Sequence, residues 1–231
     1  MRPLPTAERY LKPSDLPLEI PVFPLRGAIL LPRASLPLNV FEPRYLAMVD
    51  WALRHDRIIG IIQPLGGAEE EESPLGKHSD LRSVGCAGRL SSYQELDDGR
   101  LVITLTGIVR FRITSELSSD TPFRIMQASY DEFTCDFEQG RGEKEVDREK
   151  LLAVLRKYLD ANHLQGDWNS IMRASSEMLI NALSVMSPYG PEEKQALLEA
   201  GDLRSRADVL IALAEMELAS GGGEPGANTL Q

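Results

Sequence analysis

Four prolines divide the apolar segment between Pro21 and Tyr45 and restrict what it can form. The segment reads PVFPLRGAILLPRASLPLNVFEPRY, with prolines at positions 21, 24, 32 and 37 ahead of the closing FEPRY. Proline has no backbone N–H and a fixed φ, so it suits the ends and edges of strands and not the centre of a sheet. The segment therefore predicts strands whose prolines lie at their ends or on an edge.

A helix is predicted to begin directly after these strands. In the motif FEPRY, Pro43 suits the first helical position and Glu42 places negative charge at the helix N-terminus. Phe41 is expected to pack on Leu46 as a hydrophobic staple, which points its ring inward. Apolar residues recur at helical spacing after the motif, so we predict one helix over residues 43–54.

The same segment resembles the opening of the Lon protease N-terminal (substrate-binding) domain family. That family begins with a PLFPL…LP…LPL-x-IFE-x-RY pattern, which this chain follows from Phe23 to Tyr45. Arg33 stands where the family usually has a glycine, which leaves the local turn open. The resemblance extends over residues 17–219. The further matching residues are Gly60, Gly85 to Gly88, Asp98 to Arg100, Gly107, Arg110 and Phe111.

Residues 17–131 are predicted to be mostly strand. The continuous apolar run at residues 58–62 is typical of a strand buried on both faces. Gly99 after two aspartates predicts a hairpin turn. Apolar side chains recur on odd positions from residue 101 to residue 113, which predicts one long strand that bends or bulges at Gly107. They are those of Leu101, Ile103, Leu105, Val109, Phe111 and Ile113.

The pattern becomes helical beyond a glycine-rich linker near residue 140. Apolar stripes over residues 145–219 predict four helices with short connections, which pack most economically as a small bundle. The fold class is therefore α+β. The family resemblance implies a PUA-like curved β pseudo-barrel with one helix, followed by a C-terminal helical bundle. Residues 1–16 and 220–231 are expected to be flexible.

Charge and cysteine content narrow the classes of function. The formal net charge of -10 disfavours nucleic-acid binding, which needs clustered positive charge. Two distant cysteines do not form a disulfide framework and favour a reducing compartment. The sequence shows neither a signal-peptide core nor an apolar run long enough to span a bilayer. We therefore expect a cytoplasmic protein without nucleic-acid or membrane partners.

The sequence carries no recognisable catalytic or metal-binding pattern. The approach to a phosphate-binding loop ending at Lys77 has Glu71 in place of its first glycine, and no G-x-S-x-G motif occurs. The three histidines and two cysteines lack metal-ligand spacing, so neither metal nor cofactor is predicted. Cys86 could act as a nucleophile, but its Gly-Cys-Ala-Gly setting favours a buried packing role. We expect no enzyme, and read the chain as the N-terminal module of a Lon protease alone, without ATPase and peptidase modules.

Charged residues within the resemblance supply the candidate site. In one interpretation Glu42 pairs with an arginine brought over by the sheet and fixes the helix to the barrel. In the other, one or more arginines face a groove and bind a carboxylate or a peptide carbonyl. The sequence leaves the pairs unassigned. The candidates are Glu42, Arg44, Arg89, Arg100 and Arg110.

Three hypotheses about function follow. The first, implied by the resemblance, is a non-catalytic module that binds unfolded or specific polypeptides and is linked to protein quality control or proteolysis. A protease or a chaperone is the further partner that this hypothesis implies. Exposed sheet edges and a cleft between two subdomains suit that role. The second is a protein–protein scaffold acting through its helical bundle. The third is a peptidase or esterase, which the missing motifs disfavour.

Overall fold

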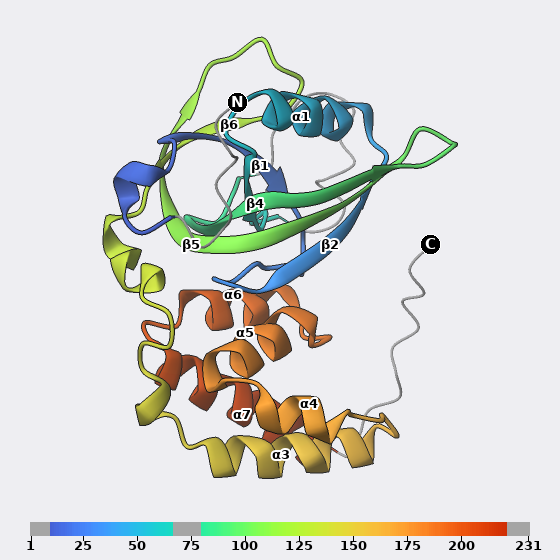
Figure 1. Cartoon of the computed structure of the whole chain (residues 1–231), viewed down its shortest axis with the longest axis vertical. Coiled ribbons are helices and arrows are strands. Elements are labelled where there is room, and N and C mark those ends of the chain that lie inside the picture. Colours follow the sequence, from blue (N-terminus) through green and yellow to red (C-terminus); the bar gives the residue numbers. More distant parts are fainter. Residues whose placement is uncertain (1–9, 67–79, 221–231) are drawn as a thin grey trace.

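The computed structural model describes residues 10–66 and 80–220 and consists of a curved sheet with helices attached to one side (Figure 1). The strands lie in the order β2-β5-β4-β3-β1-β6 within one sheet. All neighbouring pairs are antiparallel except β1 and β3, which are parallel. The strands are β1 (Glu19–Pro24), β2 (Ser35–Val40), β3 (Ile58–Ile62), β4 (Val84–Glu95), β5 (Leu101–Leu117) and β6 (Ile125–Ser129).

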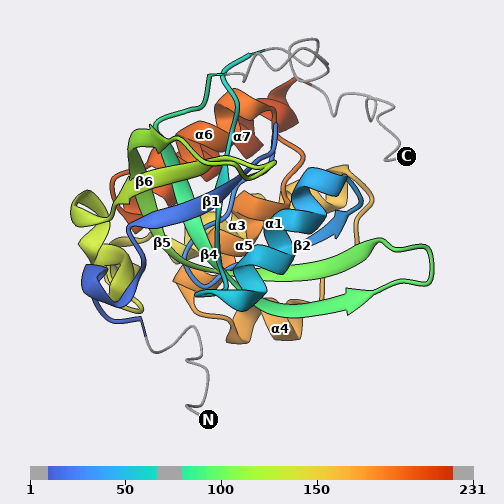
Figure 2. The ribbon, with the colours of Figure 1, turned by 90° about the horizontal axis from the view of Figure 1, so that it is seen from above.

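Strand β5 closes the sheet into a barrel-like form. Its first half pairs with β2 and β4, and its second half pairs with β4 and β6, so the ring returns through β6 to β1. Within this sheet β2 is paired only with β5, which leaves its other side as an edge. The view from above shows the strands curving around a common interior (Figure 2). The predicted α+β class with a barrel-like β part is confirmed.

The prolines lie where a missing N–H is tolerated. Pro24 is the last residue of β1, and Pro37 lies in the edge strand β2. Pro21 is the residue at which the pairing of β1 passes from β6 to β3. The tight loop between β1 and β2 contains Pro32. Pro24 and Pro37 match the prediction, whereas Pro21 lies within β1, at the point where one ladder ends and the other begins.

The long strand β5 bulges next to Gly107, as the sequence predicted. The register with β4 shifts next to Gly107, and Ile108 is the extra residue of a β-bulge. A Cβ at Gly107 would lie 2.0 Å from the carbonyl oxygen of Leu31, so the loop after β1 can pass only over a glycine. The hairpin turn before β5 also occurs as predicted, with Gly99 at a φ of 82°.

Helix α1 (Pro43–Arg54) has the predicted boundaries, but Phe41 does not have the predicted orientation. Pro43 is its first residue and Glu42 its N-cap, and α1 covers one opening of the sheet (Figures 1 and 2). The Phe41 side chain is 64% exposed, so the inward-facing staple was wrong. The barrel interior beneath the helix is filled instead by Tyr45, Met48 and other buried residues of α1.

The helical part follows a short turn-rich connection. Gly140 and Gly142 adopt φ values of 74° and 81° there, which suits a glycine linker. Four longer helices match the predicted stripes, and the short α4 is a further helix that the pattern did not reveal. The helices are α3 (Arg148–Ala161), α4 (Trp168–Arg173), α5 (Ser176–Met186), α6 (Pro191–Glu199) and α7 (Leu203–Ala219), with short 3-10 segments η2 (Pro13–Asp15), η3 (Asp131–Phe137) and η4 (Glu143–Glu145).

One apolar core runs through both parts. Buried residues of the sheet and of α5, α6 and α7 belong to the same cluster, and α5 and α6 lie nearest the sheet (Figure 1). Tyr10 and Leu16 are also buried, so this stretch of the predicted flexible arm packs on the domain. Residues 1–9 and 221–231 lie outside the described residues. The division into subdomains at 17–131 and 145–219 stays a prediction.

Candidate functional site

A cavity of about 420 Å³ opens where the sheet meets the helices. Such a volume is in the range of ligand-binding pockets. We call the inner residues of its lining, where the two parts meet, the seam. Its members are Pro32, Arg33, Arg110 and Asp136 from the β part and η3, and Glu177, Asn181 and Arg206 from helices α5 and α7.

Arg110 joins the two parts from the sheet side. It is 2% exposed, and its guanidinium donates in bidentate fashion to Asp136, from Nε at 2.9 Å and from Nη2 at 2.8 Å. Its Nη1 donates to the carbonyl oxygens of Leu198 and Ala200 at the end of α6. Phe133 stacks on the guanidinium at 4.7 Å. Every edge of this buried cation therefore has a partner, as a desolvated charge requires.

Arg33 reaches the helices from the loop after β1. Its Nη1 donates to the carbonyl oxygen of Asp136 at 2.7 Å, and its Nη2 forms an ion pair with Glu177. The backbone of Arg33 has a φ of 64°, a left-handed conformation that costs a non-glycine residue about 1–2 kcal/mol. The position keeps a glycine-like turn, although the side chain is an arginine. That side chain extends into the seam.

Arg206 is the buried cation on the helical side. It is 4% exposed, donates from Nε to the carbonyl oxygen of Leu197, and donates from Nη1 to the Asn181 side chain at 3.0 Å. Asn181 in turn donates to the carbonyl oxygen of Pro32, which ties α5 to the proline-rich loop. The pKa of Arg206 is lowered to about 10, mainly by burial and secondarily by the charge of Arg110.

The seam can recognise groups that accept hydrogen bonds. Guanidinium groups present N–H donors in a planar fork that matches carboxylates and carbonyls. Two buried donors at the cavity, Nε of Arg33 and Nη2 of Arg206, have no hydrogen-bond partner among the described residues. The arrangement therefore offers donors to a ligand.

The outer lining of the cavity is charged in both signs. Arg141 forms an ion pair with Glu138 at 2.9 Å, and Asp202 caps α7 by accepting from the backbone N–H of Ser205. That hydrogen bond lowers the pKa of the Asp202 carboxyl. The rim residues are Glu138, Arg141, Glu145, Asp202 and Arg204.

Among the five charged residues proposed from the sequence as the candidate site, Arg110 alone lines the cavity. Glu42 pairs with Arg44 of its own helix at 2.7 Å, so the predicted pair with an arginine from the sheet was wrong. The two residues are neighbours at the start of α1, where a short exposed pair forms without help from the sheet. Arg100 likewise pairs locally, with Asp98 at the hairpin turn.

Arg89 is buried in β4, away from the cavity. It is 8% exposed and lies beside Tyr10. Burial raises the pKa of the Tyr10 hydroxyl, and the charge of Arg89 opposes that shift. This contact holds the N-terminal segment against the barrel.

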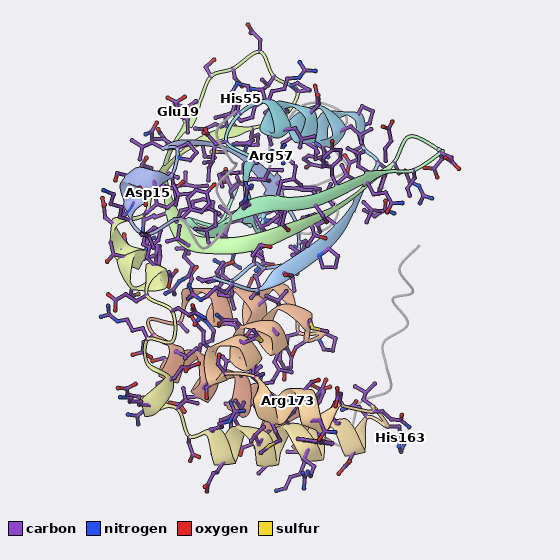
Figure 3. The ribbon with its side chains drawn as sticks, in the orientation of Figure 1. Asp15, Glu19, His55, Arg57, His163 and Arg173 are labelled. Atoms are coloured by element: carbon purple, nitrogen blue, oxygen red, sulfur yellow. The ribbon has the colours of Figure 1, made fainter. Side chains whose placement is uncertain are left out.

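Cys86 lacks the properties of a catalytic nucleophile. Cys86 is fully buried, and burial raises the pKa of its thiol, which disfavours the reactive thiolate. His55 and His163 lie at opposite ends of the molecule (Figure 3). Within residues 10–66 and 80–220, no group of three or more His, Cys, Asp and Glu side chains is arranged to hold a metal ion.

Sequence reasoning missed most of the seam. Asn181 and Arg206 are polar residues on helices, and such residues ordinarily face solvent. Apart from Arg110, which was a candidate from the sequence, Arg33 carried a signal because it replaces the glycine usual in the resembled family.

The barrel-like sheet with attached helices and a donor-lined cavity has the features of a binding domain. Over residues 19–215 the chain matches the model of the ATP-dependent protease La (LON) substrate-binding domain. The chain therefore belongs to this family.

Curated relatives and solved structures agree with this assignment. The chain is 26% identical to a Lon protease of Flavobacterium johnsoniae, over 93% of this chain and 26% of that protein. It is also 26% identical to the Escherichia coli Lon protease, over 87% of this chain and 25% of that protein. The chain thus spans about a quarter of the length of these relatives.

The fold is that of solved Lon N-terminal domains. A Lon N-terminal domain protein from Xanthomonas campestris superposes with a TM-score of 0.58 at 22% identity, covering 84% of this chain and 97% of that one. The N-terminal domain of Mycobacterium avium complex Lon protease gives a TM-score of 0.62 at 17% identity, with 85% and 98% covered. In the described part of this chain, no helix is both long and apolar enough to cross a membrane.

Proposed function

We propose that this chain recognises polypeptides for proteolysis by binding unfolded or specific segments, without catalysing a reaction itself. The observation that carries the proposal is the match to the Lon substrate-binding domain over residues 19–215. A protease or a chaperone is the partner that such a module would serve. We place this activity in the cytoplasm, as expected from the reduced cysteines.

Exposed methionines give the helical part a surface suited to varied apolar segments. Methionine is flexible and polarisable, so a methionine surface adapts to different partners. The exposed methionines of the helical part are Met172, Met178, Met186 and Met216.

The β part offers a second place for an extended chain. Strand β2 is paired only with β5, so its outer edge can accept a polypeptide as an added strand. Pro37 removes one donor from that edge and limits uncontrolled pairing. Phe41 follows β2 and is exposed, which makes it a contact residue on this proposal.

Net charge adds a preference. With a formal charge of -10, the chain favours basic apolar segments over acidic ones and disfavours nucleic acid. This preference should weaken as salt is raised, because exposed charges are screened.

Fluorescence anisotropy with a labelled, permanently unfolded apolar polypeptide tests the proposal. We expect micromolar or weaker binding, about -8 kcal/mol or less favourable, and no binding of a folded protein of similar charge. A variant carrying Met178→Ser and Met186→Ser should bind more weakly, whereas Lys157→Ser on the exposed face of α3 serves as the control. Equal absence of binding to every unfolded polypeptide would refute the proposal.

Two further measurements separate the alternatives. Capture from the lysate of its own cell should recover many unrelated unfolded proteins, whereas one stoichiometric partner would favour a scaffold. The purified chain should hydrolyse neither ATP nor casein. Turnover of casein that is lost when the chain is unfolded would favour a peptidase.

A further inference from the structure

We propose that the cavity between the sheet and the helices binds a carboxylate group, held by Arg206 and Arg33. This inference rests on the proposed function and deepens it, since the carboxylate would belong to a bound polypeptide. The evidence comes from the charges, unpartnered donors and rim of the cavity.

The inner charges of the cavity do not cancel. Three guanidinium groups line its interior, those of Arg33, Arg110 and Arg206. Only two carboxylates are engaged with them, Asp136 with Arg110 and Glu177 with Arg33. Arg206 makes its polar contacts to the neutral groups of Leu197 and Asn181. Among the described residues, Arg206 therefore has no carboxylate in ion-pair contact, and Asp136, Glu177 and Asp202 act on its charge only from a distance. A bound monoanion would supply the missing contact partner.

Unpartnered donors occur at the same place. Nη2 of Arg206 and Nε of Arg33 are buried without a hydrogen-bond partner among residues 10–66 and 80–220. Leaving a buried donor unsatisfied is unfavourable, and more so when the group is charged. Both residues line one cavity, so a ligand with two acceptor oxygens could satisfy both.

The two arginines differ in access. The side chain of Arg33 is 30% exposed, whereas Arg206 is 4% exposed. A ligand entering from solvent therefore meets Arg33 first and reaches Arg206 at the inner end. Held by its ion pair with Glu177 and its bond to the Asp136 carbonyl, Arg33 is already oriented before a ligand arrives.

The rim favours a carboxylate over a phosphate. The rim carries three carboxylates and two guanidinium groups, so it is slightly negative and disfavours a doubly charged anion more than a singly charged one. The carboxylates are those of Glu138, Glu145 and Asp202, and the guanidinium groups are those of Arg141 and Arg204. A carboxylate carries one charge, matches the single excess charge of the interior, and is planar like the guanidinium fork. The cavity volume of about 420 Å³ leaves room for the neighbouring part of a polypeptide.

The first experiment uses the wild-type chain. Three short apolar peptides of one sequence are compared by anisotropy: one with a free C-terminal carboxylate, one with a C-terminal amide, and one amidated peptide with an internal glutamate. The free acid should bind about tenfold more tightly than the amide, or about 1.4 kcal/mol. Tight binding of the glutamate peptide would assign the carboxylate to a side chain instead of a chain end. Equal affinity of all three peptides overturns the proposal.

A variant tests whether Arg206 holds the group. Arg206→Lys keeps a charge but loses the planar fork, and should reduce the preference for acid over amide to about twofold or less. Arg54→Lys changes an exposed arginine of α1 and should leave the preference unchanged. Circular dichroism shows whether each variant is folded, and the peptide comparison in wild type stands even where Arg206→Lys unfolds. A folded Arg206→Lys chain with the full preference contradicts the role of Arg206.

Failure of this inference is distinguishable from failure of the proposed function. If unfolded polypeptides bind but their terminal group has no influence, the recognition role survives and the carboxylate site is rejected. A free small carboxylate such as N-acetylalanine tests the site without a polypeptide, and its binding would shift the guanidinium NMR signals of Arg206. If this shift occurs although no polypeptide binds, the carboxylate site is supported and the polypeptide-recognition function is rejected.

Discussion

The barrel interior and the seam are both buried, but the first consists of apolar side chains and the second of charged and polar ones. Inside the sheet the side chains are apolar, as at Ile59, Val109 and Phe111. At the seam, Arg110, Asp136 and other charged groups are buried instead. Apolar burial is non-directional, whereas a buried charge is tolerated only with particular partners at hydrogen-bonding distance. The barrel therefore depends on shape and volume, and the seam depends on the identity of single residues.

This contrast predicts that removing one member of a buried ion pair at the seam destabilises the fold more than replacing both members by apolar residues. Asp136→Ala removes the carboxylate but leaves the buried Arg110, and should lower the free energy of unfolding by about 3–5 kcal/mol. Urea denaturation measures the change.

The double variant Arg110→Met with Asp136→Leu sharpens the test. Replacing both charges by apolar groups should recover a substantial part of the loss, since no unpaired charge remains. If the double variant is less stable than Asp136→Ala alone, the carbonyl contacts of Arg110 to α6 matter more than its ion pair.

Lys194 is a buried charge within the helical part, and its titration makes the stability of the fold depend on pH. Its ammonium group donates to the carbonyl oxygens of Ser184 and Val185 at the end of α5, and burial lowers its pKa from 10.5 to about 8. Below pH 8 the folded and unfolded chains both carry the proton. Between about pH 8 and 10.5 the unfolded chain keeps it while the folded chain loses it. The free energy of unfolding should therefore rise with pH in that window.

Lys194 should raise the free energy of unfolding by at most about 3 kcal/mol, which is the energy that corresponds to the lowering of its pKa. Lys194→Met should abolish that part of the rise, which separates it from the titration of tyrosines and cysteines. Unfolding curves at pH 7.5 and 10 measure it, for wild type and variant. An identical pH dependence in the two chains would show that the Lys194 pKa is unshifted.

Arg33 contributes a side chain to the seam from a strained backbone. Arg33→Ala and Arg33→Gly both remove the ion pair with Glu177, so they differ only in the backbone. Because the φ of 64° suits glycine, Arg33→Gly should be about 1 kcal/mol more stable than Arg33→Ala. Equal stability by thermal denaturation would mean that the loop relaxes to an ordinary φ in the variants.

Phe41 is expected to show the smallest effect on stability. Its ring is exposed, so Phe41→Ala should change the free energy of unfolding by about 0.5 kcal/mol or less. Phe111→Ala in the barrel interior is the matched control and should cost about 3–5 kcal/mol. A large loss at Phe41 would place its ring inward after all. Under the proposed function, Phe41→Ala should weaken binding of unfolded polypeptides and leave the melting temperature unchanged.

Local patterns in the sequence determined the elements of this protein. The positions of Pro24, Pro37 and Pro43, the apolar run of β3 and the bend at Gly107 follow from rules that act over a few residues. The family pattern supplied the architecture, and the match over residues 19–215 confirmed it.

Only the tertiary structure decided the pairings of the charges. Arg110 and Asp136 are separated by 26 residues, and Arg33 and Glu177 by 144. Periodicity reports which side of an element is buried, but carries no information about which residue of a distant element lies opposite. The predicted orientation of the Phe41 ring was wrong for the same reason, because a hydrophobic staple is a local motif that the packing of α1 on the barrel can override. Partners so far apart in sequence become neighbours only when the helices close against the sheet.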